Sequence, residues 1–373
     1  MDAVAPLPLP VDHLPEAIRR FGNPEAPTPA RTMAAKGLVP VKGADLVTLL
    51  VQLAADADAT VSQTAADNLD NLPEPVLLGA CEAQMHPSIL DAVVKRFGRN
   101  AEVLERVIPN PATADATVAR VAARCSESIT ELIATNQRRL LQAPAITEAL
   151  YKNPNTRMST ADRLVELAAR NGVELTGIPA FQQHVEAIQG QLIPEATDEP
   201  LPSDLAFTEA LAEDADDAEA IEQDSVDGTE EIKPTYQNLQ FKIRDMLASE
   251  KIRLAMIGDA AARAILVRDT NRIVSYSAIS SPRMSETEVV RIAHSKEVAD
   301  DVLRYIGNKR DWVRNYEVKR ALVFNPKCPT GIAMKYVTHL RDNDLRGLSR
   351  SRNVPMPIKT AAKQRMQMKQ RGK

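Results

Sequence analysis

The sequence predicts an all-α protein in which helices pair into hairpins that repeat along the chain. Two observations on composition and one on spacing predict this fold class. Among 373 residues, Gly is scarce at 14 and aromatic residues make up 3%, whereas Pro is abundant at 25. Sandwiches, barrels and propellers need many tight turns and large β-surface side chains, so this composition disfavours them. The third observation is a proline step that recurs after 43 or 44 residues.

The recurring step is Asn or Ser followed by Pro. Proline lacks an amide donor and disfavours a helical conformation in the residue before it, and Asn or Ser in front of it suits a turn or a cap. Each step therefore ends one helix and redirects the chain into the next. Two helices per 43–44 residues are typical of helical solenoids. The four steps are Asn110-Pro111, Asn153-Pro154, Ser281-Pro282 and Asn325-Pro326.

An amphipathic helix is predicted after each step, in chain order. The apolar stripes are Val118, Val121, Ala122 and Cys125 after the first step, and Leu164, Leu167 and Ala168 after the second. After Pro282, Ser285 and Glu288 form a capping box, which satisfies two amide donors at the start of a helix. The next helix is predicted to stop at Gly307, and Thr330 is predicted to cap the helix after the fourth step.

These turns carry a resemblance to a known class of repeat. Asn153-Pro154-Asn155-Thr156, followed by Leu164 and Leu167, is similar to bacterial HEAT-like repeats of the leucine-rich-repeat-variant type, as is the segment that starts at Asn325-Pro326. The resemblance covers residues 40–190 and 237–366, and the part from about Lys251 to Met366 also resembles an uncharacterised bacterial domain. It implies a right-handed α-solenoid of HEAT-like helical hairpins used as a binding surface, and it supplies no catalytic residues.

Charge is strongly segregated along the chain. Residues 193–232 hold 15 Asp and Glu and no Lys or Arg, whereas residues 233–373 hold 29 Lys and Arg against 13 Asp and Glu. Self-repulsion and weak burial predict an acidic disordered linker over 193–236. The linker separates helical-repeat segments at 31–192 and 237–366, with a Pro-rich flexible arm at 1–30 and a basic tail at 367–373.

No motif for catalysis, cofactor binding or metal ligation is present in the sequence. It contains no His-Glu-x-x-His, no Cys-x-x-Cys, no nucleotide-binding glycine loop and no Gly-x-Ser-x-Gly. We therefore predict no catalytic residues, no cofactor and no metal site. Cys81 and Cys125 are predicted core residues, and Cys328 is predicted to lie in a turn, where it could be exposed. The odd number and wide spacing of the cysteines, with no secretory signal or membrane-spanning stretch, favour a cytoplasmic protein.

The basic half supplies the candidate binding residues. A helix starting near Asp311 would place Trp312 and Tyr316 on one face, because they are four residues apart. One interpretation makes the aromatic residues core and the cations a solvated face. The other places the cations on one rim of a groove that holds phosphates or an acidic peptide. The candidates are Arg268, Arg272, Lys309, Arg310, Arg314, Lys319 and Arg320.

Three functions are compatible with these observations. The favoured one is a non-catalytic protein-binding scaffold or adaptor whose C-terminal segment prefers acidic partners. The alternative is nucleic-acid binding through phosphate contacts of the basic segment, with no membrane partner. A helical-repeat enzyme acting on nucleic acid is the third, with Asp311 beside Trp312 as its only candidate. The acidic linker is either a spacer or an intramolecular cover for the basic segment.

Overall fold

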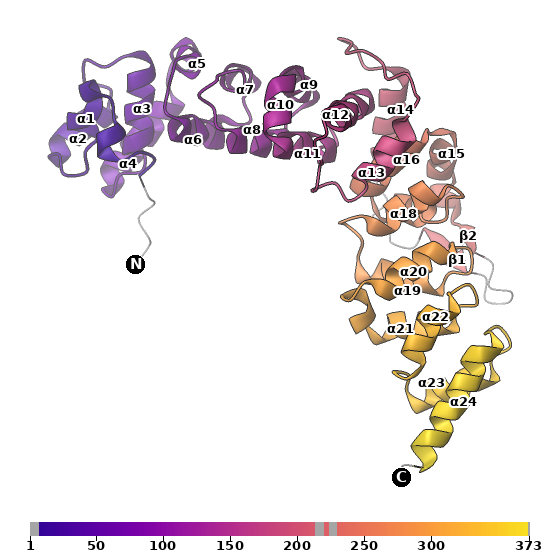
Figure 1. Ribbon diagram of the computed structural model, residues 1–373. Coiled ribbons are helices and arrows are strands. Elements are labelled where there is room, and N and C mark those ends of the chain that lie inside the picture. The colour runs from indigo at the N-terminus through magenta and orange to yellow at the C-terminus, as the bar shows by residue number, and fades with distance from the viewer. Residues whose placement is uncertain (1–6, 213–219, 224–229, 372–373) are drawn as a thin grey trace. The chain divides into compact units, whose positions relative to one another are not determined.

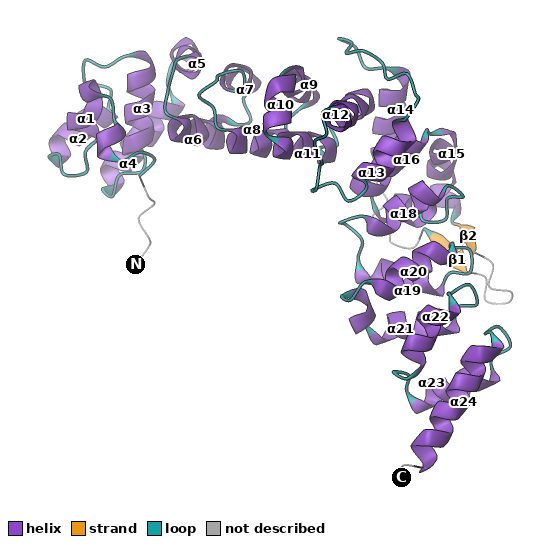
Figure 2. Cartoon of the chain, viewed as in Figure 1, coloured by secondary structure: helices purple, strands orange, loops and turns teal. Residues whose placement is uncertain are grey.

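The computed structural model describes residues 7–212, 220–223 and 230–371 (Figure 1). Within these residues the chain forms 24 α-helices and one two-stranded antiparallel sheet (Figure 2). The predicted all-α fold class is confirmed. The chain divides into two compact units, Met1–Thr156 and Arg157–Lys373.

The first unit is a succession of short helices. Its elements are η1 (Val11–His13), α1 (Glu16–Gly22), α2 (Thr28–Ala35), α3 (Gly43–Leu53), α4 (Ala59–Asp70), α5 (Glu74–Glu82), α6 (Pro87–Phe97), α7 (Ala101–Val107), α8 (Asp115–Ala122), α9 (Glu127–Thr135), α10 (Gln137–Gln142) and α11 (Pro144–Lys152). Along much of the unit a helix packs on the one two positions further on: α3 on α5, α5 on α7 and α7 on α9. Apolar residues at helical spacing form the buried faces.

A flexible arm is predicted over residues 1–30, but residues 7–30 contain η1, α1 and the start of α2; residues 1–6 lie outside the described residues. Leu9, Leu14 and Ile18 are buried. The side chain of Gln52 fixes the backbone of Leu9, because its Oε1 accepts from the Leu9 N–H at 3.0 Å and its Nε2 donates to the Leu9 carbonyl at 2.8 Å. The prolines therefore separate short packed helices rather than keep the segment extended.

The second unit is also a succession of short helices, with one small sheet. Its elements are α12 (Met158–Arg170), α13 (Phe181–Ile188), α14 (Pro202–Leu211), β1 (Ile221–Gln223), β2 (Glu230–Ile232), η2 (Pro234–Tyr236), α15 (Gln237–Asp245), α16 (Ala248–Ile257), α17 (Ala260–Leu266), α18 (Arg272–Ser280), α19 (Glu286–His294), α20 (Asp300–Asn308), η3 (Trp312–Arg314), α21 (Tyr316–Phe324), α22 (Thr330–Val337), α23 (Asp342–Arg350) and α24 (Met356–Arg371). From α16 onward the helices form two rows. One row contains α16, α18, α20, α22 and α24, and the other contains α17, α19 and α21, each helix packing on the next of its row.

The predicted disordered linker, residues 193–236, belongs to this second unit and carries α14, β1, β2 and η2. Phe207 of α14 is 1% exposed and Asp204 is 2% exposed. The Asp204 carboxylate accepts from the Ser159 N–H at 2.7 Å and from the Ser159 hydroxyl at 3.0 Å. Ser159 lies in the first turn of α12, where amides lack helical partners. The disorder prediction therefore does not hold for these elements; residues 213–219 and 224–229 lie outside the described residues.

The end of the chain also differs from the prediction. Residues 367–371 of the predicted basic tail continue α24, which ends at Arg371. Residues 372–373 lie outside the described part of the chain.

The Asn-Pro steps act as buried links between consecutive hairpins. Asn325 Nδ2 donates to the carbonyls of Ala293 and Ser295 at 2.8 and 2.7 Å, while its Oδ1 accepts from the Lys327 N–H at 2.9 Å. Asn110 and Asn153 repeat this pattern on carbonyls 27–31 residues earlier. One side chain therefore shapes its own turn and satisfies the end of the helix in the preceding hairpin.

Candidate functional site

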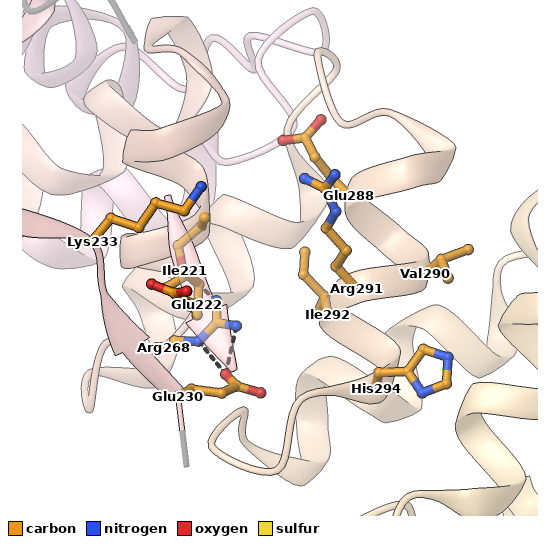
Figure 3. A pocket seen from close by; sticks show the side chains of 11 residues that line it. Ile221, Glu222, Glu230, Lys233, Arg268, Glu288, Val290, Arg291, Ile292 and His294 are labelled. Carbon is orange, nitrogen blue, oxygen red and sulfur yellow. Dashed lines mark hydrogen bonds and ion pairs between the residues drawn. The ribbon is translucent and has the colours of Figure 1, made fainter. Parts of the chain in front are cut away.

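A carboxylate from the acidic stretch is held where α17 and α19 end. Glu230 begins β2, Arg268 follows α17, and Ser295 follows α19. Arg268 Nε and Nη2 donate to Glu230 Oε2 at 2.9 and 2.7 Å (Figure 3). The Ser295 hydroxyl donates to the same oxygen at 2.7 Å. The side chains of Glu230 and Arg268 are only 5% and 14% exposed, so this is a largely desolvated, charge-assisted contact.

Helix ends position both donors. Arg268 Nη1 donates to the carbonyl of Ala264 in the last turn of α17, at 2.6 Å, which orients the guanidinium. The Ser295 N–H donates to the carbonyls of Arg291 and Ile292 at the end of α19. The Ser295 carbonyl is itself an acceptor for the repeat residue Asn325. Ser295, which binds the Glu230 carboxylate, is therefore held in place by one of the hydrogen bonds that join the hairpins.

A cavity of about 600 Å³ adjoins this contact and is lined from β1, β2, α17 and α19 (Figure 3). Its charged groups have both signs. Burial would raise the pKa of Glu288, but hydrogen bonds from Arg263 and Ser285 outweigh burial and lower it. Burial and the nearby Arg320 charge lower the pKa of His294. The cavity thus presents charged groups of both signs, an arrangement that suits recognition of a charged chain.

Three aromatic side chains form a second cluster across the other row of helices. Tyr276 of α18 meets Tyr305 of α20 edge to face, with ring centroids 5.3 Å apart, and Tyr305 meets Trp312 of η3 at 5.8 Å. Lys309 Nζ lies 3.9 Å from the centroid of Trp312, a cation–π geometry. Burial raises the pKa of Tyr305. A hollow of about 460 Å³ adjoins the Tyr276 and Tyr305 rings.

The structure distributes the predicted cations over several groups. Arg268 binds Glu230, Lys309 covers Trp312, and Arg310 and Arg314 are exposed on either side of Asp311. Lys319 is half-buried on α21. The remaining ion pairs are Arg272 with Asp301 at 2.8 Å, Arg314 with Asp311 at 3.6 Å and Arg320 with Asp344 at 3.0 Å. Most of these cations therefore already have a partner within the chain.

The predicted helix from Asp311 is interrupted, so Trp312 and Tyr316 do not share one helix face. Trp312 lies in η3, whereas Tyr316 starts α21, and Asn315 caps α21 by accepting from the Glu317 N–H at 2.9 Å. The Tyr316 hydroxyl contacts Asp344 rather than the aromatic cluster. Asp311, the enzyme candidate, is exposed and pairs with Arg314.

The cysteines are buried thiols. Burial raises the pKa of Cys81 and Cys125 to about 11 and that of Cys328 to about 12. Cys328, predicted to lie in a turn, is 3% exposed, because its turn is the one that Asn325 folds onto the preceding hairpin. Within residues 7–212, 220–223 and 230–371, no group of three His, Cys, Asp or Glu side chains is arranged to hold a metal ion.

Two contributors to the carboxylate contact escaped the sequence prediction. Glu230 is one of many acids in the stretch 193–232, and no local pattern marks it. Ser295 follows a helix end and carries no motif. The only available signal was the opposite charge of the two segments, which predicts attraction but not the residues that meet.

Comparisons with known proteins identify no relative of this chain. No family model, curated protein or solved structure matches the chain. Among the described helices, none combines the length and apolarity that crossing a bilayer requires. The HEAT-like assignment therefore stays a prediction.

Proposed function

We propose that this chain is a non-catalytic scaffold or adaptor that holds an acidic segment of a protein partner against α17 and α19. The observation that carries the proposal is the contact of Glu230 with Arg268 and Ser295. It places a carboxylate of an acidic strand at the ends of two stacked helices. A partner strand with carboxylates would meet the same donors.

The stacked helices support a binding role. In the second unit α16, α18, α20, α22 and α24 pack successively in one row, and α17, α19 and α21 pack successively in the other. The Asn-Pro links repeat between hairpins. We propose that these hairpins form a right-handed α-solenoid of the HEAT-like type. Such stacks contact only their neighbours and leave long surfaces open to partners.

The chain's own strand acts as a competitor in this proposal. Hydrogen bonds to a charged group contribute about 1.5–3 kcal/mol each, and a tethered segment has an effective concentration of the order of millimolar. An external acidic segment must therefore displace Glu230 before it reaches Arg268. The acidic stretch then sets a threshold for binding rather than serving only as a spacer.

Fluorescence anisotropy of labelled decaglutamate with the full chain tests the proposal. Glu230→Gln removes the competing charge and is expected to tighten binding about tenfold, which corresponds to 1.4 kcal/mol. Arg268→Gln is expected to weaken binding about tenfold or more, because a charge-assisted hydrogen bond is lost.

Arg314→Gln is the matched control, because it removes the same charge from an exposed site. Circular dichroism establishes that each variant is folded. Equal weakening by Arg268→Gln and Arg314→Gln would show that decaglutamate senses only net charge, and the proposed site would be rejected.

A further inference from the structure

The last helical hairpin carries a concentrated positive charge that the acidic-segment site does not use. Residues 345–373 contain nine Lys and Arg and no Asp or Glu. α23 and α24 pack on one another, and α24 also packs on α22 (Figure 1). Lys369 of α24 pairs with Asp342 at the start of α23, at 2.6 Å, so the two helices run antiparallel.

Five other cations of this hairpin lack carboxylate partners among the residues that the structure describes. Arg346, Arg350, Arg352 and Lys363 are exposed and Lys359 is half-buried; across the described residues none of the five makes an ion pair. The Nε of Arg365 is also buried, and it has no hydrogen-bond acceptor among the described residues. This surface differs from the predicted cations Arg268, Arg272, Arg314 and Arg320, each of which has an acidic partner.

The spacing of these cations suits a regular array of negative charges. Arg346 and Arg350 are four residues apart on α23, and so are Lys359 and Lys363 on α24. Residues four apart share a helix face and lie about 6 Å apart along the axis. Double-stranded DNA carries one phosphate per about 3.4 Å of axis on each strand, so the two cations of such a pair are separated by about the distance between every second phosphate. We propose that the α23–α24 hairpin binds the phosphate backbone of double-helical nucleic acid without reading its sequence.

A duplex fits this surface better than other polyanions do. No Phe, Tyr or Trp follows Tyr336 in the sequence, so the surface has no aromatic platform on which the bases of a single strand would stack. Ile358 and Ala362 of α24 are fully buried, whereas Met356 and Met368 of the same helix are 68% and 65% exposed. These two methionines are twelve residues apart and do not share a helix face, so they form no continuous apolar face for insertion into the interface of a bilayer.

The test is a salt titration of full-length protein with labelled 20-base-pair duplexes of two unrelated sequences. Both are expected to bind equally, in the range of about 10⁻⁴–10⁻⁶ M near physiological salt. The variant Arg346→Gln, Arg350→Gln, Lys359→Gln, Lys363→Gln removes four cations of the hairpin. Its slope of log affinity against log salt is expected to be shallower by about 0.9 per lost phosphate contact, or about 3.6 in all.

A control with the same change in net charge is available on other surfaces. Arg310→Gln, Arg314→Gln, Lys327→Gln, Lys335→Gln removes four exposed cations outside the hairpin and is expected to leave most of the slope intact. An equal loss in both variants would overturn the proposal, because net charge alone would then explain binding. Tighter binding to phosphatidylserine vesicles or to a single strand than to the duplex would also overturn it.

This inference goes beyond the proposed acidic-segment site, and an experiment can refute either proposal without refuting the other. The hairpin variant is expected to bind decaglutamate like the unmodified chain, and Arg268→Gln is expected to bind duplex like the unmodified chain. If Arg268→Gln lowers duplex affinity as much as the hairpin variant does, the hairpin is not the nucleic-acid surface.

Discussion

Replacement of Asn325 by Ala tests how the hairpins are joined. Asn325 is 2% exposed, and the substitution removes three hydrogen bonds of 2.7–2.9 Å: two to the carbonyls of Ala293 and Ser295 and one from the Lys327 N–H. At about 1 kcal/mol net for each buried hydrogen bond, the loss is about 3 kcal/mol. In a unit of this size, a midpoint shift of about 2–4 °C per kcal/mol gives about 6–12 °C.

Ser281→Ala is the matched control, because Ser281 is also 2% exposed and also precedes a proline. Its hydroxyl accepts one long hydrogen bond, from the Arg283 N–H at 3.4 Å. The hydrogen bond to the preceding hairpin comes instead from the side chain of Arg283, which donates to the Ile257 carbonyl. We expect it to cost less than about 1 kcal/mol. Urea and thermal denaturation followed by circular dichroism measure both variants. Equal costs would refute the view that the Asn side chain links the hairpins.

Three further predictions concern packing, charge and thiol reactivity. Gly307→Ala places a Cβ 2.3 Å from a side-chain atom of α22 and is expected to destabilise the chain by about 1–3 kcal/mol. Gly79→Ala meets open space and is expected to stabilise the chain by about 0.5–1 kcal/mol. The midpoints of denaturant unfolding measure both changes in stability. For Asp91, burial is outweighed by hydrogen bonds from α6 and α8, which lower the pKa from 3.8 to about 2. Its contribution to stability is present above about pH 4 and is lost as pH falls toward 2, so Asp91→Asn should flatten the acid limb of a stability–pH curve. Cys328, with its pKa raised to about 12 by burial, should resist thiol reagents until the chain unfolds; fast labelling of the native protein would contradict its burial.

The sequence predicted those parts of the fold that depend on local chemistry. The capping box of Ser285 and Glu288 is present at the start of α19, and the proline steps end helices as expected. Thr330 and Gly307 show where local chemistry was insufficient. Thr330 is the first residue of α22 without a side-chain capping bond. Gly307 lies within α20, where its lack of a side chain admits Ile332 rather than stopping the helix.

The candidate site depends on contacts between distant residues, which spacing does not reveal. Glu230 and Arg268 are 38 residues apart, and Ser295 lies 65 residues after Glu230. Charge content alone predicted a disordered acidic stretch. The structure adds that Asp204 caps α12 and that Phe207 lies 5.0 Å from the guanidinium of the buried Arg253. Specific partners of a few side chains therefore outweigh the average composition of the stretch.

Hydrogen–deuterium exchange of the full chain, with and without decaglutamate, tests the central claim most directly. The claim is that an acidic segment replaces the strand that contains Glu230 at the ends of α17 and α19. The account predicts faster exchange of the amides of β2, Glu230–Ile232, and slower exchange around Ser295 when decaglutamate is added. Unchanged exchange in β2 and around Ser295 at saturating decaglutamate would contradict the account.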